Sequence, residues 1–266
     1  MRRHRTIYFN DARHYYLFVF EPPMTLEDAW RPVDEAASTA VDTFSYGVER
    51  GDGLFYPSRV GMRFGEDIQP FEQAAYWRVW NNMQSLIDRG LDPLTVLIDR
   101  AHEKGIDFWG SIRPNHAQDP AAVDTADNST FKIEHPEWHL KTRPGHPFNW
   151  TIPEVRAERL SLIEEAVTQY DLDGFELDFV FCPYLFEEGE VDQNVHIVTE
   201  FMGDVRRIVN ETAADHGRSI TLGARVLPTP ESNAATGLDV ATWIKTGLVD
   251  FVVPVVYGPR QMDVNF

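Results

Sequence analysis

The chain has 266 residues, which is enough to bury a large hydrophobic core and fits one large domain better than two small ones. Its 42 acidic and 24 basic residues give a formal charge of −18, and the resulting negative field repels nucleic acid and anionic lipid. Cys182 is the single cysteine, so the chain can form neither an internal disulfide nor a thiolate metal cluster.

The N-terminal residues Met1 to Arg5 are basic, but Asn10, Asp11 and Arg13 come before any sustained apolar run. This order predicts no secretory signal peptide in the chain. No run of about 18 apolar residues exists that would predict a membrane span. We therefore expect a soluble protein, and the sequence leaves its compartment and its oligomeric state open.

Apolar segments rich in Val, Ile, Phe and Tyr alternate with segments of helical periodicity from the N-terminus onward. The first strand is predicted at Tyr15 to Phe20, and a capping box of Thr25 and Asp28 predicts the start of the first helix. The second strand is predicted at Val41 to Val48. The glycine-rich and aromatic stretch from Glu49 to about Arg89 is predicted to be a long irregular segment.

The next helix has the clearest boundaries in the sequence. Asp92 is predicted to cap it, Pro93 occupies its first turn, and Gly105 ends it. A strand follows at once from Ile106 to Ile112, and the region from Arg113 to Trp150, with its prolines and histidines, is predicted to be a second long loop.

The C-terminal half continues the alternation. Thr151 and Glu154 predict a capping box that opens another helix. The later elements are predicted as a strand at Gly174 to Phe181, a helix through Val198 to Val209 that ends at Gly217, a strand at Ser219 to Val226, a helix at Val240 to Ile244, and a strand at Val249 to Tyr257.

Strands that alternate with helices are typical of a parallel α/β fold, either an open doubly wound sheet or a TIM-type (β/α) barrel. Polar residues follow several different strands, and in a barrel all of these strand ends meet at one mouth. They are Glu49, Arg113 with Asn115, Asp178, Arg225 and Tyr257. We therefore predict a single parallel (β/α) barrel over residues 1–266, with about six βα units and without the last strands of a complete barrel.

Two carboxylates lie on the strand at Gly174 to Phe181. Alternate side chains of a strand share a face, so Glu176 and Asp178 point the same way, about 7 Å apart along the strand. Such inward carboxylates need a cation, a hydrogen-bond network or a catalytic task. Glu176 is interpreted either as a catalytic acid or as a structural acid paired with an arginine such as Arg225, and Asp178 is predicted to act in catalysis or to contact the substrate.

The segment Asp173-Gly174-Phe175-Glu176-Leu177-Asp178-Phe179 and the earlier His135-Pro136-Glu137-Trp138 resemble the glycosyl-hydrolase-like TIM-barrel proteins of polysaccharide-degrading bacteria, the family-10-like group. The resemblance covers most of the chain, from about Tyr15 to Tyr257. It implies a carbohydrate-active barrel with its site at the C-terminal mouth, and it places the acid of the family's fourth strand at Asp178.

The same strand is also similar to the acidic strand of chitinases. In that pattern Val180 stands where the proton-donating glutamate would be, which argues against chitinase-type, substrate-assisted chemistry.

Glycoside cleavage normally uses two carboxyl groups. Beside Asp178, the candidates for the second are Glu176, Glu49, Glu231 and Glu21, and the sequence does not choose among them. The predicted substrate-binding residues are Tyr46, Arg113, Asn115, His116, Arg225 and Tyr257. No cofactor and no metal are predicted, because Pro136 interrupts the spacing of His135 and His139.

Three functions remain open at this point. The first is a glycoside hydrolase acting on a poly- or oligosaccharide through Asp178. The second is a noncatalytic carbohydrate-binding barrel. The third is a metal-dependent hydrolase or isomerase on the same fold, which requires at least three His, Asp or Glu side chains at one point in the mouth.

Overall fold

The computed structural model describes residues 5–11, 18–66, 70–71, 73–117 and 128–256. Its main sheet has six strands, all parallel, in the order β1-β2-β5-β6-β7-β8. These strands are β1 (Ile7–Asn10), β2 (Thr43–Gly47), β5 (Asp107–Ile112), β6 (Gly174–Asp178), β7 (Thr221–Val226) and β8 (Phe251–Pro254). A separate antiparallel pair of two-residue strands, β3 (Glu49–Arg50) and β4 (Gly53–Leu54), follows β2.

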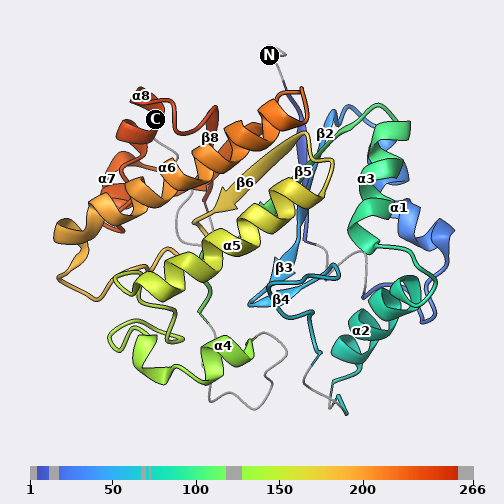
Figure 1. The fold of residues 1–266 in the computed structure, drawn as a ribbon, viewed down its shortest axis with the longest axis horizontal. Coiled ribbons are helices and arrows are strands. Elements are labelled where there is room, and N and C mark those ends of the chain that lie inside the picture. Colours follow the sequence, from blue (N-terminus) through green and yellow to red (C-terminus); the bar gives the residue numbers. More distant parts are fainter. Residues whose placement is uncertain (1–4, 12–17, 67–69, 72, 118–127, 257–266) are drawn as a thin grey trace.

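Helices connect the strands and cover the outside of the sheet (Figure 1). They are α1 (Leu26–Ala37), α2 (Ala74–Ile87), α3 (Pro93–Glu103), α4 (Thr130–Ile133), a 3-10 helix at Pro136–Trp138, α5 (Pro153–Gln169), α6 (Val191–Asp215), α7 (Pro230–Ala234) and α8 (Val240–Lys245). The β3–β4 pair and α4 lie beyond the lower ends of the strands in Figure 1. This alternation gives the parallel (β/α) architecture that the sequence predicts.

The main sheet is curled like the wall of a barrel. Trp109 of β5 stacks on Phe251 of β8 with ring centroids 5.0 Å apart, although β6 and β7 lie between these two strands. In a flat sheet, strands that are three positions apart would be separated by roughly 14 Å. The contact between inward side chains therefore shows a sheet of TIM-barrel type, and the predicted fold class is confirmed.

Two glycines make room for this ring pair. A Cβ atom on Gly174 would lie 2.5 Å from Nε1 of Trp109, and one on Gly223 would lie 2.3 Å from Cζ of Phe251. Both distances are far inside van der Waals contact, and a buried aromatic ring cannot move aside as the end of a flexible chain can. The missing side chains on β6 and β7 are thus what lets the two rings meet inside the curl.

We expect Gly223→Ala to lower the free energy of unfolding by about 1 to 3 kcal/mol, because the added methyl group overpacks the interior. The matched control is Gly203→Ala in α6, where an added Cβ meets no atom within 4 Å. There the change is expected to stabilise by about 0.5 to 1 kcal/mol, since alanine favours a helix over glycine. Urea denaturation of both variants measures the difference, and equal effects would contradict the packing argument.

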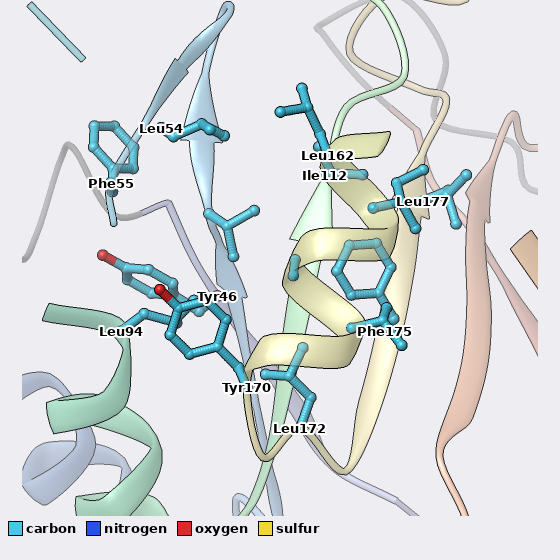
Figure 2. Packing of buried hydrophobic residues seen from close by; sticks show 14 of the residues in the cluster. Tyr46, Leu54, Phe55, Leu94, Ile112, Leu162, Tyr170, Leu172, Phe175 and Leu177 are labelled. Atoms are coloured by element: carbon cyan, nitrogen blue, oxygen red, sulfur yellow. The ribbon is translucent and has the colours of Figure 1, made fainter. Parts of the chain in front are cut away.

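The hydrophobic core lies between the outer face of the sheet and the helices. Figure 2 shows Phe175 and Leu177 of β6 beside Leu162 of α5, and Tyr46 of β2 near Tyr170. All five residues are almost fully buried. The outward positions of the strands are therefore apolar, and the polar positions of the sheet face the inside of the barrel.

Two predicted helix starts are confirmed and one is wrong. Thr25 and Asp28 form the reciprocal capping box of α1, and Asp92 caps α3 by accepting hydrogen bonds from Leu94 and Thr95. Helix α5 begins instead at Pro153 without a side-chain cap. The hydroxyl of Thr151 is used elsewhere, because it donates to Asn149.

The N-terminal strand was predicted in the wrong place. The structure puts β1 at Ile7–Asn10, while residues 18–20 form turns and residues 15–17 lie outside the described part of the chain. The motif Ile-Tyr-Phe-Asn is short and is followed by polar residues, so the longer apolar run at Tyr15 to Phe20 was the stronger strand pattern.

The segment from Glu49 to Arg89 is more regular than predicted. It contains the β3–β4 pair and the 14-residue helix α2. Gln73 precedes α2 without a side-chain hydrogen bond to the helix, so the usual start signal is missing from the sequence.

Within the described ranges, none of the helices combines the length and the apolar character that crossing a membrane requires.

Candidate active site

A cavity of about 330 Å³ opens at the carboxyl ends of the strands. The sequence predicts that polar strand ends converge, and the lining includes the predicted Arg113, Asp178 and Arg225. The full lining consists of Phe9, Asp11, Arg50, Arg113, Asp178, Val180, Phe181, Arg225 and Val255. Residues that are far apart in the sequence therefore meet at this mouth.

Asp178 is the last residue of β6 and is held between two arginines. Its Oδ2 atom accepts a hydrogen bond from Nη1 of Arg225 at 3.4 Å and lies 3.8 Å from Nε of Arg113. Its Oδ1 atom accepts the backbone N–H of Val180 at 2.9 Å. Two positive charges and one backbone dipole thus fix the position of this carboxylate and balance its charge.

Each of these arginines lies over an aromatic ring. The guanidinium carbon of Arg113 is 4.3 Å from the ring centroid of Phe181, and that of Arg225 is 4.0 Å from the ring of Phe9. Cation–π contacts of this kind restrict long side chains that would otherwise sample many rotamers. The walls on both sides of Asp178 are therefore ordered, and they carry an apolar ring beside each positive charge.

Glu176 lies one pleat deeper in the barrel than Asp178. It accepts a hydrogen bond from Nη2 of Arg225 at 2.6 Å and another from the hydroxyl of Ser111 at 3.0 Å. Burial raises the pKa of this carboxyl, while Arg225 opposes the shift. Glu176 is absent from the cavity lining, so it acts on the mouth by holding Arg225. This arginine is the partner that the structural interpretation of Glu176 predicts.

Asp11 is a cavity residue that the sequence did not suggest. It follows β1 directly, and its Oδ2 atom lies 3.3 Å from Nη2 of Arg113. Recognising Ile7–Asn10 as the first strand would have identified Asp11, because it then occupies a strand end like the other polar lining residues. Phe181 was missed for a different reason: it was predicted as the last residue of the strand, whereas β6 ends at Asp178.

Glu49 lies behind the cavity wall and does not line it. Its Oε1 atom accepts the backbone N–H of Arg113 at 2.9 Å, and the residue is only 2% exposed. Burial raises the pKa of its carboxyl to about 7, and the nearby Arg113 limits the rise. Glu49 therefore fixes the end of β5, and its charge changes near neutral pH.

The buried carboxyl of Glu49 predicts a pH-dependent stability. Because its pKa is higher in the folded chain than in the unfolded chain, the folded state binds more protons between about pH 4.5 and pH 7. The free energy of unfolding should then fall by roughly 2 to 3 kcal/mol as pH rises through this window. We expect Glu49→Gln to remove this part of the fall, measured as the difference between urea denaturations at pH 5 and pH 8. The same pH dependence in both proteins would contradict the assignment.

Tyr46 is not at the mouth, which corrects its predicted role in substrate binding. It is 1% exposed and faces the helices, where its ring lies 6.0 Å from that of Phe108 (Figure 2). The strand period explains the difference, because Ser45 and Gly47 occupy the inward positions on either side of Tyr46.

Asn115 and His116 also differ from their predicted role as sugar-binding donors. Asn115 donates to the carbonyls of Phe148 and Tyr184, and its side-chain oxygen accepts the N–H of His116 and of Phe148. His116 is buried, and its Nε2 lies 2.9 Å from Asp52. Both side chains thus hold loops together and do not reach the cavity.

Two further acidic candidates do not line the cavity. Glu231 is exposed in the first turn of α7, and Glu21 is exposed and pairs with Arg78. Tyr257 lies outside the described residues.

A buried charge network supports the loops around the mouth. Asp52, in the turn between β3 and β4, contacts His116 at 2.9 Å, Arg159 of α5 at 3.0 Å and the hydroxyl of Ser129 at 2.9 Å. The positive partners lower the pKa of Asp52 well below its usual value despite burial, and burial lowers the pKa of His116. The network joins the two long loops that the sequence treats as separate.

Metal ligation was the third possibility that the sequence left open. Among the described residues, no group of three or more His, Cys, Asp or Glu side chains is arranged to hold a metal ion. His135 instead stacks on Trp138 with centroids 3.6 Å apart.

Comparison with known families and proteins gives matches to glycosyl-hydrolase-like proteins. The family model described as glycosyl hydrolase-like 10 matches residues 38–198. The curated protein glycosyl hydrolase YngK of Bacillus subtilis (strain 168) is 24% identical over 212 residues. That alignment covers 64% of this chain and 39% of YngK, so the chain spans well under half of that relative's length.

Solved structures agree in fold. An α-L-fucosidase isoenzyme from Paenibacillus thiaminolyticus matches with a TM-score of 0.51 and 14% identity, covering 87% of this chain and 34% of the fucosidase. An α-amylase from Geobacillus thermoleovorans matches with a TM-score of 0.50 and 13% identity, covering 88% of this chain and 50% of the amylase. At this level of identity the likeness concerns the fold alone.

Proposed function

Because the chain belongs to the glycosyl hydrolase-like 10 family, we propose that it cleaves a glycosidic bond of a poly- or oligosaccharide at the barrel mouth, with Asp178 as the reactive carboxylate. The observation that carries the proposal is the position of Asp178 in the cavity, between Arg113 and Arg225. The substrate class comes from the family, and the residue comes from the geometry.

The charge of the carboxylate suits this chemistry. Glycoside cleavage passes through a transition state in which positive charge develops on the sugar ring. A fixed carboxylate at that ring stabilises the developing charge, and a group that is already positioned pays no reorganisation cost during the reaction. Asp178 is fixed in this way by Arg113, Arg225 and the N–H of Val180.

The cavity also suits an uncharged sugar. Its acidic residues, Asp11 and Asp178, face three arginines, and Glu176 neutralises part of the charge of Arg225. Strong net charge is therefore avoided at the mouth, although the chain as a whole carries −18. The rings of Phe9 and Phe181 offer apolar surface for the faces of a pyranose ring.

A noncatalytic carbohydrate-binding barrel is the second candidate. The observation that favours it is that Asp178 is already engaged by two arginines, as a purely structural carboxylate would be.

Incubation of the purified protein with a panel of starch, xylan, mannan, galactan, β-glucan and chitin tests both proposals. New reducing ends, with defined oligosaccharide products in chromatography, support cleavage. Retardation of the protein in gels that contain a polysaccharide, without any new reducing ends, supports the binding barrel. If the protein neither cleaves nor binds any polysaccharide of the panel, both proposals are contradicted.

A further inference from the structure

Asp11 and Asp178 share one arginine at the mouth. Nη2 of Arg113 lies 3.3 Å from Oδ2 of Asp11, and Nε of the same guanidinium lies 3.8 Å from Oδ2 of Asp178. These two nitrogens are roughly 2.3 Å apart in the rigid planar group. The two carboxylate oxygens therefore lie no farther apart than roughly 9.5 Å, which is the upper limit of the separations at which paired carboxyl groups cleave glycosides.

We propose that Asp11 is the second catalytic carboxyl group and transfers the proton to the leaving group. This inference rests on the proposed glycoside cleavage and adds the residue that Asp178 requires as a partner. Among the described residues that line the cavity, Asp11 and Asp178 are the two acids. Glu49 and Glu176 are buried behind the wall, at 2% and 1% exposed, and do not line it.

The two acids differ in how they are held and in how accessible they are. The side chain of Asp178 is 6% exposed and contacts two arginines, which fix it in place at the cavity. The side chain of Asp11 is 25% exposed and contacts one of these arginines, so it is the more accessible of the two to a leaving group and to water.

Arg113 supports this division of roles. Its positive charge is shared among Glu49, Asp11 and Asp178, so no single carboxyl group takes up the whole charge. When Asp11 releases its proton, the guanidinium at 3.3 Å stabilises the carboxylate that forms.

The step balances as a hydrolysis. The bond between the anomeric carbon and the glycosidic oxygen breaks, its electron pair goes to that oxygen, and the proton of Asp11 completes the hydroxyl of the leaving group. Water supplies the hydroxyl that ends on the anomeric carbon, and the proton left from that water restores the carboxyl group of Asp11. Asp178 stabilises the positive charge on the ring throughout.

Leaving-group dependence tests the role of Asp11. Phenyl and dinitrophenyl glycosides of the sugar released in the polysaccharide panel differ in how much they need a proton to depart. We expect Asp11→Asn to lower kcat/KM for the phenyl glycoside by about 10²- to 10⁴-fold, and for the dinitrophenyl glycoside by less than about tenfold. Asp178→Asn should lower both, because stabilisation of the ring charge is needed with either leaving group.

The pH profile gives a second measurement that a structural role would not affect. The loss of kcat/KM at high pH in the unsubstituted protein reports ionisation of the acid, so it should be absent in Asp11→Asn. Equal losses for both glycosides, or an unchanged pH profile, would overturn the assignment of Asp11 and leave that of Asp178 intact. If the unsubstituted protein cleaves no glycoside at all, the proposed function itself fails.

Discussion

Asp178→Asn is expected to lower kcat/KM for glycoside cleavage by about 10³-fold or more, whichever leaving group the substrate carries. Asparagine has the same shape, and its side-chain oxygen can still accept the N–H of Val180. The substitution removes the negative charge that faces the developing positive charge of the sugar, together with the oxygen that accepts from Arg225. The fold should stay intact, because Arg225 keeps Glu176 as a partner and Arg113 keeps Asp11.

Asp204→Asn in α6 is the matched control, since Asp204 is an exposed aspartate in a surface ion pair. Its activity should equal that of the unsubstituted protein. The measurement is release of reducing ends from the polysaccharide that the panel identifies, with thermal unfolding of both variants. An Asp178→Asn variant that stays folded and retains activity within about tenfold would exclude Asp178 as the reactive carboxylate.

Arg159→Met is expected to lower the free energy of unfolding by about 3 to 5 kcal/mol, the largest stability effect that we predict. Arg159 is 1% exposed and pairs with Asp52 at 3.0 Å and with the adjacent Glu158. Methionine fills a similar volume, but it leaves the fully buried carboxylate of Asp52 without this cation. Breaking a buried pair from one side is costly because the remaining charge stays desolvated.

Arg207→Met provides the comparison. Arg207 also pairs with two acids, Asp204 and Glu211, but its side chain is 54% exposed. Pairs of this kind contribute about 0 to 1 kcal/mol, so the control should change little in urea denaturation. If the two variants lost similar amounts of unfolding free energy, the prediction that the buried network around Asp52 stabilises the fold more than a surface ion pair does would be wrong.

The strands were largely predictable because their residues are either apolar throughout, as in strands that are buried on both faces, or alternate strictly between the two faces of the sheet. The predicted strands at Ile106 to Ile112 and Ser219 to Val226 contain β5 and β7, and the cap at Asp92 was found from residue type alone. Strand β1 was not found, because four residues bounded by polar side chains carry too little pattern. Helix α2 was not found, because it lacks a capping side chain.

The site was predictable only in part. Arg113, Asp178 and Arg225 follow from the rule that parallel strands of a barrel end at one mouth. Asn115 and His116 obey the same rule, but their hydrogen bonds go to Phe148, Tyr184 and Asp52 from remote parts of the chain. No local pattern reveals such partners, whereas Asp11 was missed because β1, the strand that it follows, was not recognised.

The ring pair of Trp109 and Phe251 occupies the inside of the curl between β5 and β8. Bulky side chains fill the interior of a barrel of this type, so this part of it is packed protein and not a channel. Space for a ligand is left at the carboxyl ends of the strands, where the cavity lies.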